Sequence, residues 1–238
     1  MLLGMGSESR RVFVQRVVAA GAIAVTPLAA TAPTLACHSD LLEKTRALLD
    51  SLKDRVVDNF LVDWPVTQAR RSGVPASLPV LRWLPEVQAH APAFSTSLIS
   101  ELYRAASCRA WRQTYKVPDV DAEFLTNYGW TELVGLTGDL ASTRIACGFL
   151  LLGPATHYPR HRHEAEEIYV PLAGTAAWQH GNGPWQEQPP GTVIHHASEE
   201  PHAMRTGNQP LLAVYLWRSA NLNQKSQLDP TDTRSLSD

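Results

Sequence analysis

Seven of the nine histidines in this 238-residue chain fall in one short segment that ends at His202. The segment contains the ordered set His161-x-His163-x3-Glu167, then Gly174, then His202. Imidazole nitrogens and a carboxylate oxygen suit Zn²⁺, Fe²⁺, Mn²⁺ or Ni²⁺, and the ligand types alone do not choose among them. A lone H-x-H pair is more often a surface feature. The complete set predicts one divalent transition metal, Zn²⁺ or Fe²⁺ ahead of Mn²⁺ or Ni²⁺.

The spacing of these residues fits an extended chain, in which successive side chains point to opposite faces. His161 and His163 then share one face, and Glu167 shares a face with Tyr169. Two imidazoles, a carboxylate and a phenol are therefore expected on an inward face. With at most four protein ligands, an octahedral metal would keep positions open for substrate or water.

The ordered pattern resembles the first and second motifs of the cupin superfamily. A narrower resemblance is to the cupin dimethylsulfoniopropionate (DMSP) lyases, carried by the segments HYPRHRHEAEEIYVPLAGTAAWQ, PPGTVIHHASEEPHAMRT and PLLAVYLWR. It implies a double-stranded β-helix barrel with the metal inside, held by His161, His163, Glu167 and His202. Glu166 is the competing carboxylate, but the spacings to His163 and to Gly174 favour Glu167.

The same resemblance implies that Tyr169 is the catalytic base of a β-elimination that cleaves DMSP to dimethyl sulfide and acrylate. A tyrosine normally titrates near 10, so it accepts a proton at neutral pH only where a nearby cation or donor favours its phenolate. The other interpretation is an aromatic wall residue that orients Glu167 through a hydrogen bond. Tyr158, just before the first ligand, is the second candidate for the base.

The implied substrate is a small sulfonium carboxylate, whose cationic end needs aromatic faces more than an anion. Tyr215 and Trp217 share a face of one predicted strand and Trp178 lies on another, although core packing explains such residues as well. His195 and His196 would lie on opposite faces, as neighbours of the site or plain strand residues. His157 and His180 receive no role and are expected at the surface.

The rest of the chain falls into elements that must position this site. A helical N-terminal region is predicted for residues 38–118, with one amphipathic helix from Ser39 to Pro65 and another from Ser95 or Thr96 to Trp111. A β-sandwich or barrel over residues 119–223 follows from six short strands, and a loose polar tail occupies 224–238. The strands are expected at 131–136, 144–152, 167–172, 175–180, 191–196 and 211–217. Cys108 and Cys147 either form a disulfide or remain buried thiols.

The first 36 residues carry Arg10 and Arg11 before a short apolar run, which resembles a twin-arginine export signal and predicts a periplasmic or exported protein. The run is too short for a permanent membrane span. The formal net charge of −2 disfavours a non-specific nucleic-acid partner. A homodimer is one option for the oligomeric state.

Three functions fit these features. The leading hypothesis is a metal-dependent carbon–sulfur lyase that acts on DMSP. A cupin oxygenase or isomerase would use the same ligands for Fe²⁺ and another small molecule. A non-catalytic metal-binding or ligand-binding cupin would keep Tyr169 only for structure.

Overall fold

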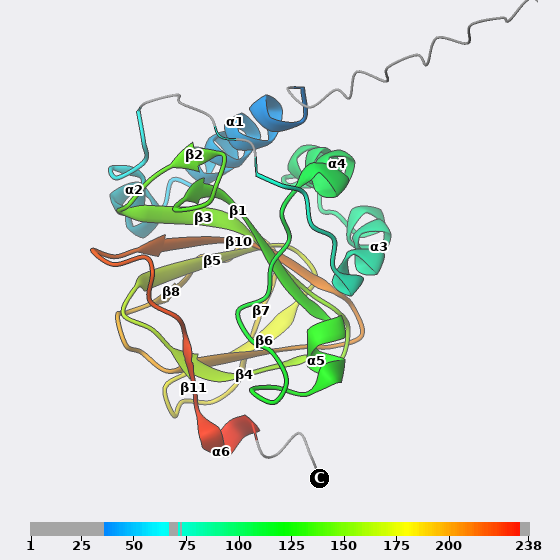
Figure 1. Ribbon diagram of the computed structural model, residues 1–238, viewed down its shortest axis with the longest axis vertical. Coiled ribbons are helices and arrows are strands. Elements are labelled where there is room, and N and C mark those ends of the chain that lie inside the picture. The colour runs from blue at the N-terminus through cyan, green and yellow to red at the C-terminus, as the bar shows by residue number, and fades with distance from the viewer. Residues whose placement is uncertain (1–35, 67–70, 72, 234–238) are drawn as a thin grey trace, which may run out of the picture. The chain divides into compact units, whose positions relative to one another are not determined.

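The computed structural model describes residues 36–66, 71 and 73–233, which form a helical layer followed by two facing β-sheets (Figure 1). The predicted export signal lies outside the described residues. The helices are α1 (Ala36–Ser51), α2 (Arg55–Leu61), α3 (Leu84–Ala89), α4 (Thr96–Ala105), α5 (Ala122–Thr126) and α6 (Pro230–Thr233), with 3₁₀ turns η1 (Pro79–Trp83) and η2 (Ala106–Cys108). None of the described helices is both long and apolar enough to cross a membrane.

The single helix predicted from Ser39 to Pro65 is wrong, because the chain breaks between α1 and α2. Lys53 adopts a left-handed conformation with φ of 53°. The Asp54 carboxylate then accepts hydrogen bonds from the backbone N–H groups of Val56 and Val57, as an N-cap does. The predicted second helix is also shorter than expected, since α4 ends at Ala105.

The strands form one sheet in the order β2-β1-β3-β10-β5-β8 and a second in the order β11-β4-β9-β6-β7. Their bounds are β1 (Tyr128–Gly135), β2 (Leu140–Ala141), β3 (Ile145–Leu152), β4 (His157–Arg162), β5 (Glu166–Ala173), β6 (Ala176–His180), β7 (Gln186–Gln188), β8 (Ile194–His196), β9 (His202–Thr206), β10 (Leu211–Arg218) and β11 (Gln227–Leu228). Part of the tail predicted to be loose is thus ordered, because β11 pairs with β4.

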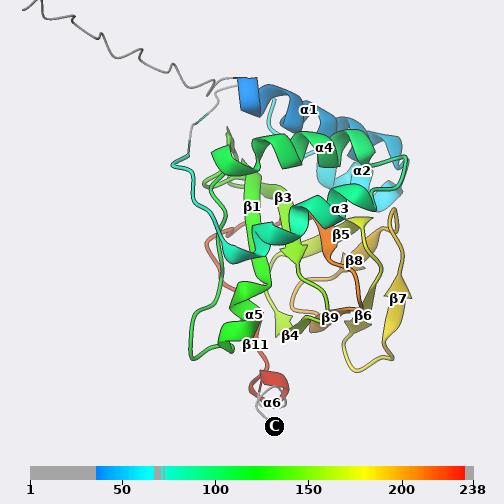
Figure 2. The same ribbon diagram turned by 90° about the vertical axis from the view of Figure 1, so that its right-hand side faces the viewer.

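The six-stranded sheet is buried on both faces, which explains why every residue of β3 is buried. Alternate residues such as Phe149 and Val214 pack with the helices in one apolar cluster. Their neighbours, such as Leu150 and Tyr215, belong to a second cluster between the sheets. Helices α1 to α4 lie on the outer side of this sheet, and the five-stranded sheet lies on the other (Figures 1 and 2). Cys147 on β3 is a buried free thiol, so no disulfide joins it to Cys108.

The stretch that carries the metal motif crosses from one sheet to the other. Strand β4, with His161, belongs to the five-stranded sheet, whereas β5, with Glu167, belongs to the six-stranded sheet. A short turn after Arg162 joins them. Because the two strands face each other across the interior, ligands close in sequence approach from opposite walls.

Gly174 directly follows β5 and has a conformation that glycine adopts most easily, with φ of 79°. A Cβ at this position would collide with the carbonyl oxygen of Pro210. We expect Gly174→Ala to lower the free energy of unfolding by about 2 kcal/mol or more, as measured by urea denaturation. Gly207→Ala is the matched control, because a Cβ there meets nothing within 4 Å, and it should change stability by less than about 0.5 kcal/mol. Equal effects would contradict this explanation.

Candidate metal centre and active site

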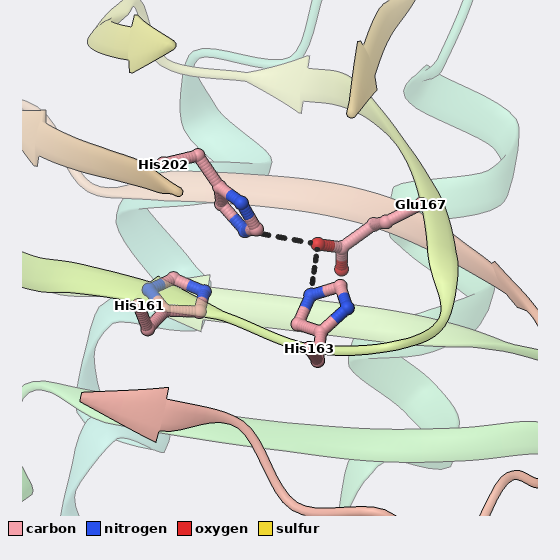
Figure 3. Close-up of side chains that lie close together, drawn as sticks. All are labelled: His161, His163, Glu167 and His202. Atoms are coloured by element: carbon pink, nitrogen blue, oxygen red, sulfur yellow. Dashed lines mark hydrogen bonds and ion pairs between the residues drawn. The ribbon is translucent and has the colours of Figure 1, made fainter. Parts of the chain in front are cut away.

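Four side chains with metal-ligating atoms meet between the two sheets (Figure 3). His161 lies on β4, His163 in the turn that follows, Glu167 on β5 and His202 on β9. Their ligating atoms all lie within 4.8 Å of one another, and no side chain is more than 2% exposed. The structure therefore brings together all four residues that the sequence selected as metal ligands.

Main-chain carbonyls fix the orientation of all three imidazoles. The Nδ1 atom of His161 lies 2.8 Å from the Pro159 carbonyl oxygen, and that of His202 lies 2.9 Å from the Glu200 carbonyl oxygen. His163 Nδ1 lies at 2.8 Å from the carbonyl oxygen of Ala165. When Nδ1 carries the proton and donates it to a carbonyl, the lone pair is on Nε2. This tautomer binds a metal through Nε2.

The pKa values of three of these groups are shifted by burial and by one another. Burial alone would raise the pKa of Glu167, but His163 and His202 hold it well below its ordinary range, so the carboxylate is charged. Burial, together with His202 and His163, lowers the pKa of His161 well below its ordinary value. Burial opposes the charged form of His163 too, but Glu167 outweighs it and raises that pKa. The charged Glu167 carboxylate thus favours a proton on His163, and a bound metal ion would replace that proton.

One buried atom supports this assignment directly. His202 Nε2 lies 3.1 Å from Glu167 Oε2 but forms no aligned hydrogen bond within the described part of the chain. His163 Nε2 lies 3.0 Å from the same oxygen. Three imidazole nitrogens and one carboxylate oxygen within 4.8 Å of one another match the donor set of a divalent transition-metal site, without selecting the metal.

A pocket of about 450 Å³ opens onto this cluster. His161 and Glu167 form part of its wall, together with both tyrosines proposed as bases, Tyr158 and Tyr169. This volume falls within the range of small-molecule sites in proteins, and the wall includes both polar and aromatic side chains. The arrangement can hold a small molecule against the metal ligands.

The two candidate bases lie in different surroundings. Tyr158 stacks on His161 with ring centroids 4.2 Å apart, and its hydroxyl donates to the Tyr115 hydroxyl at 3.3 Å. Tyr169 packs beside Trp178 at 4.9 Å. Burial, then the charge of Glu167, raises the pKa of Tyr169 well above its ordinary value. Burial, then Tyr115 and Tyr128, does the same for Tyr158.

Of the three aromatic residues expected to contact a sulfonium group, two line the pocket. Tyr215 and Trp217 are on its wall, whereas Trp178 is fully buried behind Tyr169 and is not. Trp130 also lines the pocket, 6.4 Å from Tyr215 in an edge-on contact. Sequence reasoning missed Trp130 because it started that strand at Thr131, although Trp130 has the parity of the inward-facing residues of β1.

Trp217 does more than line the pocket. Its indole Nε1 donates to Glu167 Oε1 at 2.5 Å, and its ring lies 4.3 Å from that of His163. It therefore orients a metal ligand through a hydrogen bond to Oε1, whereas His163 contacts the other carboxylate oxygen, Oε2. The strand register pairs Trp217 directly with Glu167 across β10 and β5.

Trp217→Phe is expected to weaken metal binding about 10-fold to 100-fold, because an aromatic ring remains but the donor to Glu167 is lost. Competition with a chromophoric chelator measures this affinity. Trp130→Phe is the control: its indole Nε1 donates to Thr114 Oγ1 at 3.1 Å rather than to a ligand. Identical affinities in the two variants would contradict an orienting role for Trp217.

Comparison with known proteins places the chain among its relatives. A family model described as DMSP lyase matches residues 52–213. The chain is 36% identical over 114 residues to DMSP lyase DddQ of Ruegeria pomeroyi, which covers 48% of the chain and 57% of that protein. It is 34% identical over 128 residues to the putative DMSP lyase DddL of Cereibacter sphaeroides, which covers 52% of each. The match thus spans little more than half the length of these two relatives.

Solved structures extend the likeness over most of the chain. A chain from the crystal structures of the DMSP lyases RdDddP and RnDddQII matches with a TM-score of 0.76 and 30% identity, covering 82% of this chain and 99% of that one. The crystal structure of DddQ from Ruegeria pomeroyi matches with a TM-score of 0.73 and 27% identity, covering 81% and 96%. These matches confirm the mostly β, cupin-type fold with a helical N-terminal region that was predicted. By sequence and by structure, the chain belongs to the DMSP lyase family.

Proposed function

We propose that this protein is a metal-dependent carbon–sulfur lyase that cleaves DMSP to dimethyl sulfide and acrylate. The observation that carries the proposal is the buried cluster of three histidines and Glu167 beside a pocket of about 450 Å³, in a chain of the DMSP lyase family. The family supplies the substrate class. The cluster supplies a reason why this chain itself is equipped for the reaction.

The pocket suits a small molecule with a cationic end. Trp130, Tyr215 and Trp217 lie on its wall, and contact with aromatic faces stabilises a desolvated onium group by up to about 2 kcal/mol. His161, His163, Glu167 and His202 would hold a divalent cation, which would supply Lewis-acid chemistry toward the substrate carboxylate. The sulfonium and the carboxylate of DMSP therefore have separate places in the same pocket.

Tyr169 is the residue we assign to proton removal. Its oxygen takes the proton from the carbon next to the carboxylate, and the freed electron pair forms the double bond of acrylate. The carbon–sulfur bond breaks at the same time, and dimethyl sulfide leaves with that bonding pair. Because burial and Glu167 raise the pKa of Tyr169, this role requires the positive charge of the loaded metal centre nearby.

Tyr158 has a different part in this proposal. Its hydroxyl is engaged with Tyr115 and its ring covers His161. Such contacts hold the ring of a metal ligand in place. We therefore assign Tyr158 to positioning His161, with Tyr169 as the base.

The test is headspace gas chromatography of dimethyl sulfide and chromatography of acrylate, from DMSP with metal-loaded and chelated protein. Equal amounts of both products, formed only with metal, are expected. Oxygen uptake with another small molecule would favour the oxygenase alternative. Tight binding of DMSP without either product would indicate a binding protein and overturn the lyase proposal.

We also propose that residues 1–36 direct export by the twin-arginine route, on the basis of Arg10 and Arg11 and the short apolar run that follows. Such export carries folded proteins, so the metal would be inserted before the protein crosses the membrane. Cell fractionation tests the proposal: mature protein in the periplasm is expected, and full-length protein confined to the cytosol would contradict it.

A further inference from the structure

The rows of side chains that form the metal centre continue beyond it. Across β4, β9 and β6, the register places His161, His202 and His180 directly beside one another. In the facing six-stranded sheet, Glu167 on β5 is paired with His196 on β8. Since directly paired residues point to the same face of a sheet, His180 and His196 approach each other from opposite walls, next to the first centre.

Glu200, in the loop before β9, completes a second cluster. The ligating atoms of His180, His196 and Glu200 all lie within 4.8 Å of one another. Glu200 Oε2 accepts a hydrogen bond from the Ala197 backbone N–H at 2.9 Å, while Oε1 faces His180 Nδ1 at 3.6 Å. One oxygen therefore holds the carboxylate in place and the other is directed at the histidines.

His196 gives an independent sign that this cluster accepts a ligand. Its side chain is fully buried, and neither ring nitrogen has a hydrogen-bond partner within the described part of the chain. Leaving a buried polar atom without a partner costs about 1 to 3 kcal/mol. The ring stacks on His202 at 4.0 Å and lies 4.4 Å from His180, contacts that satisfy neither nitrogen.

The other two side chains of the cluster are partly open to solvent. The side chain of His180, which was expected at the surface without a role, is 34% exposed, and that of Glu200 is 32% exposed.

We propose that His180, His196 and Glu200 form a second site for a divalent transition metal ion of the Zn²⁺ type, adjacent to the first. Two imidazoles and one carboxylate leave a coordination position for water, as in open zinc sites. Because two of its ligands are partly exposed, this site is expected to bind more weakly and exchange faster than the buried centre. Glu200 links the two sites, since its carbonyl oxygen is the partner of His202 Nδ1.

The test is equilibrium dialysis of the full chain against Zn²⁺, with the bound metal counted by mass spectrometry. Wild type is expected to bind two Zn²⁺ per chain, one of which a mild chelator removes first. His180→Ala and Glu200→Gln should each keep only the tightly bound ion. Glu200→Gln retains an oxygen for the Ala197 N–H and the carbonyl that orients His202, so the first centre stays intact.

His90→Ala is the matched control, because His90 is an exposed histidine whose ring contacts the Glu86 carbonyl oxygen, far from both clusters in sequence. This variant should still bind two Zn²⁺. A wild-type stoichiometry of one, or two Zn²⁺ in both His180→Ala and Glu200→Gln, would overturn the second site. The measurement needs no substrate, so its outcome is separate from that of the lyase assay.

Discussion

Glu167→Gln is expected to lose the bound metal and at least about 1,000-fold in DMSP turnover, because it removes the only carboxylate oxygen from the cluster. Glu167 is fully buried and lies within 3.1 Å of both His163 and His202. A neutral amide has nearly the same shape but lacks the negative charge that attracts a cation to the three imidazoles. Metal content by mass spectrometry and headspace dimethyl sulfide measure the two effects.

Glu166→Gln is the matched control for this substitution, since the two glutamates are neighbours on one strand. The Glu166 side chain points to the opposite face, where it pairs with Arg218 at 2.6 Å and His195 at 2.8 Å, and it is 30% exposed. Such partly exposed pairs contribute up to about 1 kcal/mol, so stability should change little and the metal should remain. Loss of metal in both variants would contradict the assignment of Glu167 as the ligand.

The ligands could be predicted from sequence because strand alternation is a local property. Arg162 is exposed between the buried His161 and His163, as the alternation requires. Glu166 and Glu167 separate to opposite faces for the same reason. The spacing of the motif therefore predicts which of its side chains face the interior.

The features that sequence reasoning missed depend on pairing between distant segments. The position of His180 beside His202, and of His196 beside Glu167, follows from register between strands that no local pattern reveals. The same holds for Lys225 and Ser226, which reach the pocket wall from a tail whose polar composition indicates only a loose end. Trp178 was expected to contact the substrate but lies outside the pocket wall. Hydrophobicity alone does not distinguish a residue of the wall from one of the core behind it.

The helical region could be recognised from sequence, but its place could not. Its amphipathic pattern predicts an apolar face without saying what covers it. In the structure this face packs on the outer side of the six-stranded sheet, and that is why β3 and β10 are apolar on both faces. The helices support the strands that carry Glu167 and Tyr169 from behind, and the pocket lies on the opposite side.

Tyr169→Phe is expected to lower the turnover of DMSP about 100-fold to 10,000-fold while metal content is unchanged. The substitution removes one hydroxyl from a buried ring that packs on Trp178, so the pocket keeps its shape. Initial rates of dimethyl sulfide release, with metal content measured on the same samples, separate proton transfer from metal binding. A base contributes to the chemical step alone, so the loss should fall on kcat.

The competing role for Tyr169 makes a different prediction from the same variant. If its hydroxyl only orients Glu167, Tyr169→Phe should weaken metal binding about 10-fold to 100-fold, and excess metal should restore turnover. Tyr158→Phe provides the comparison, because its ring still covers His161 but loses the hydroxyl bonded to Tyr115. Only the base is needed after the metal and the substrate are bound. If both variants retain metal and Tyr158→Phe loses more kcat than Tyr169→Phe, the two assignments would be reversed.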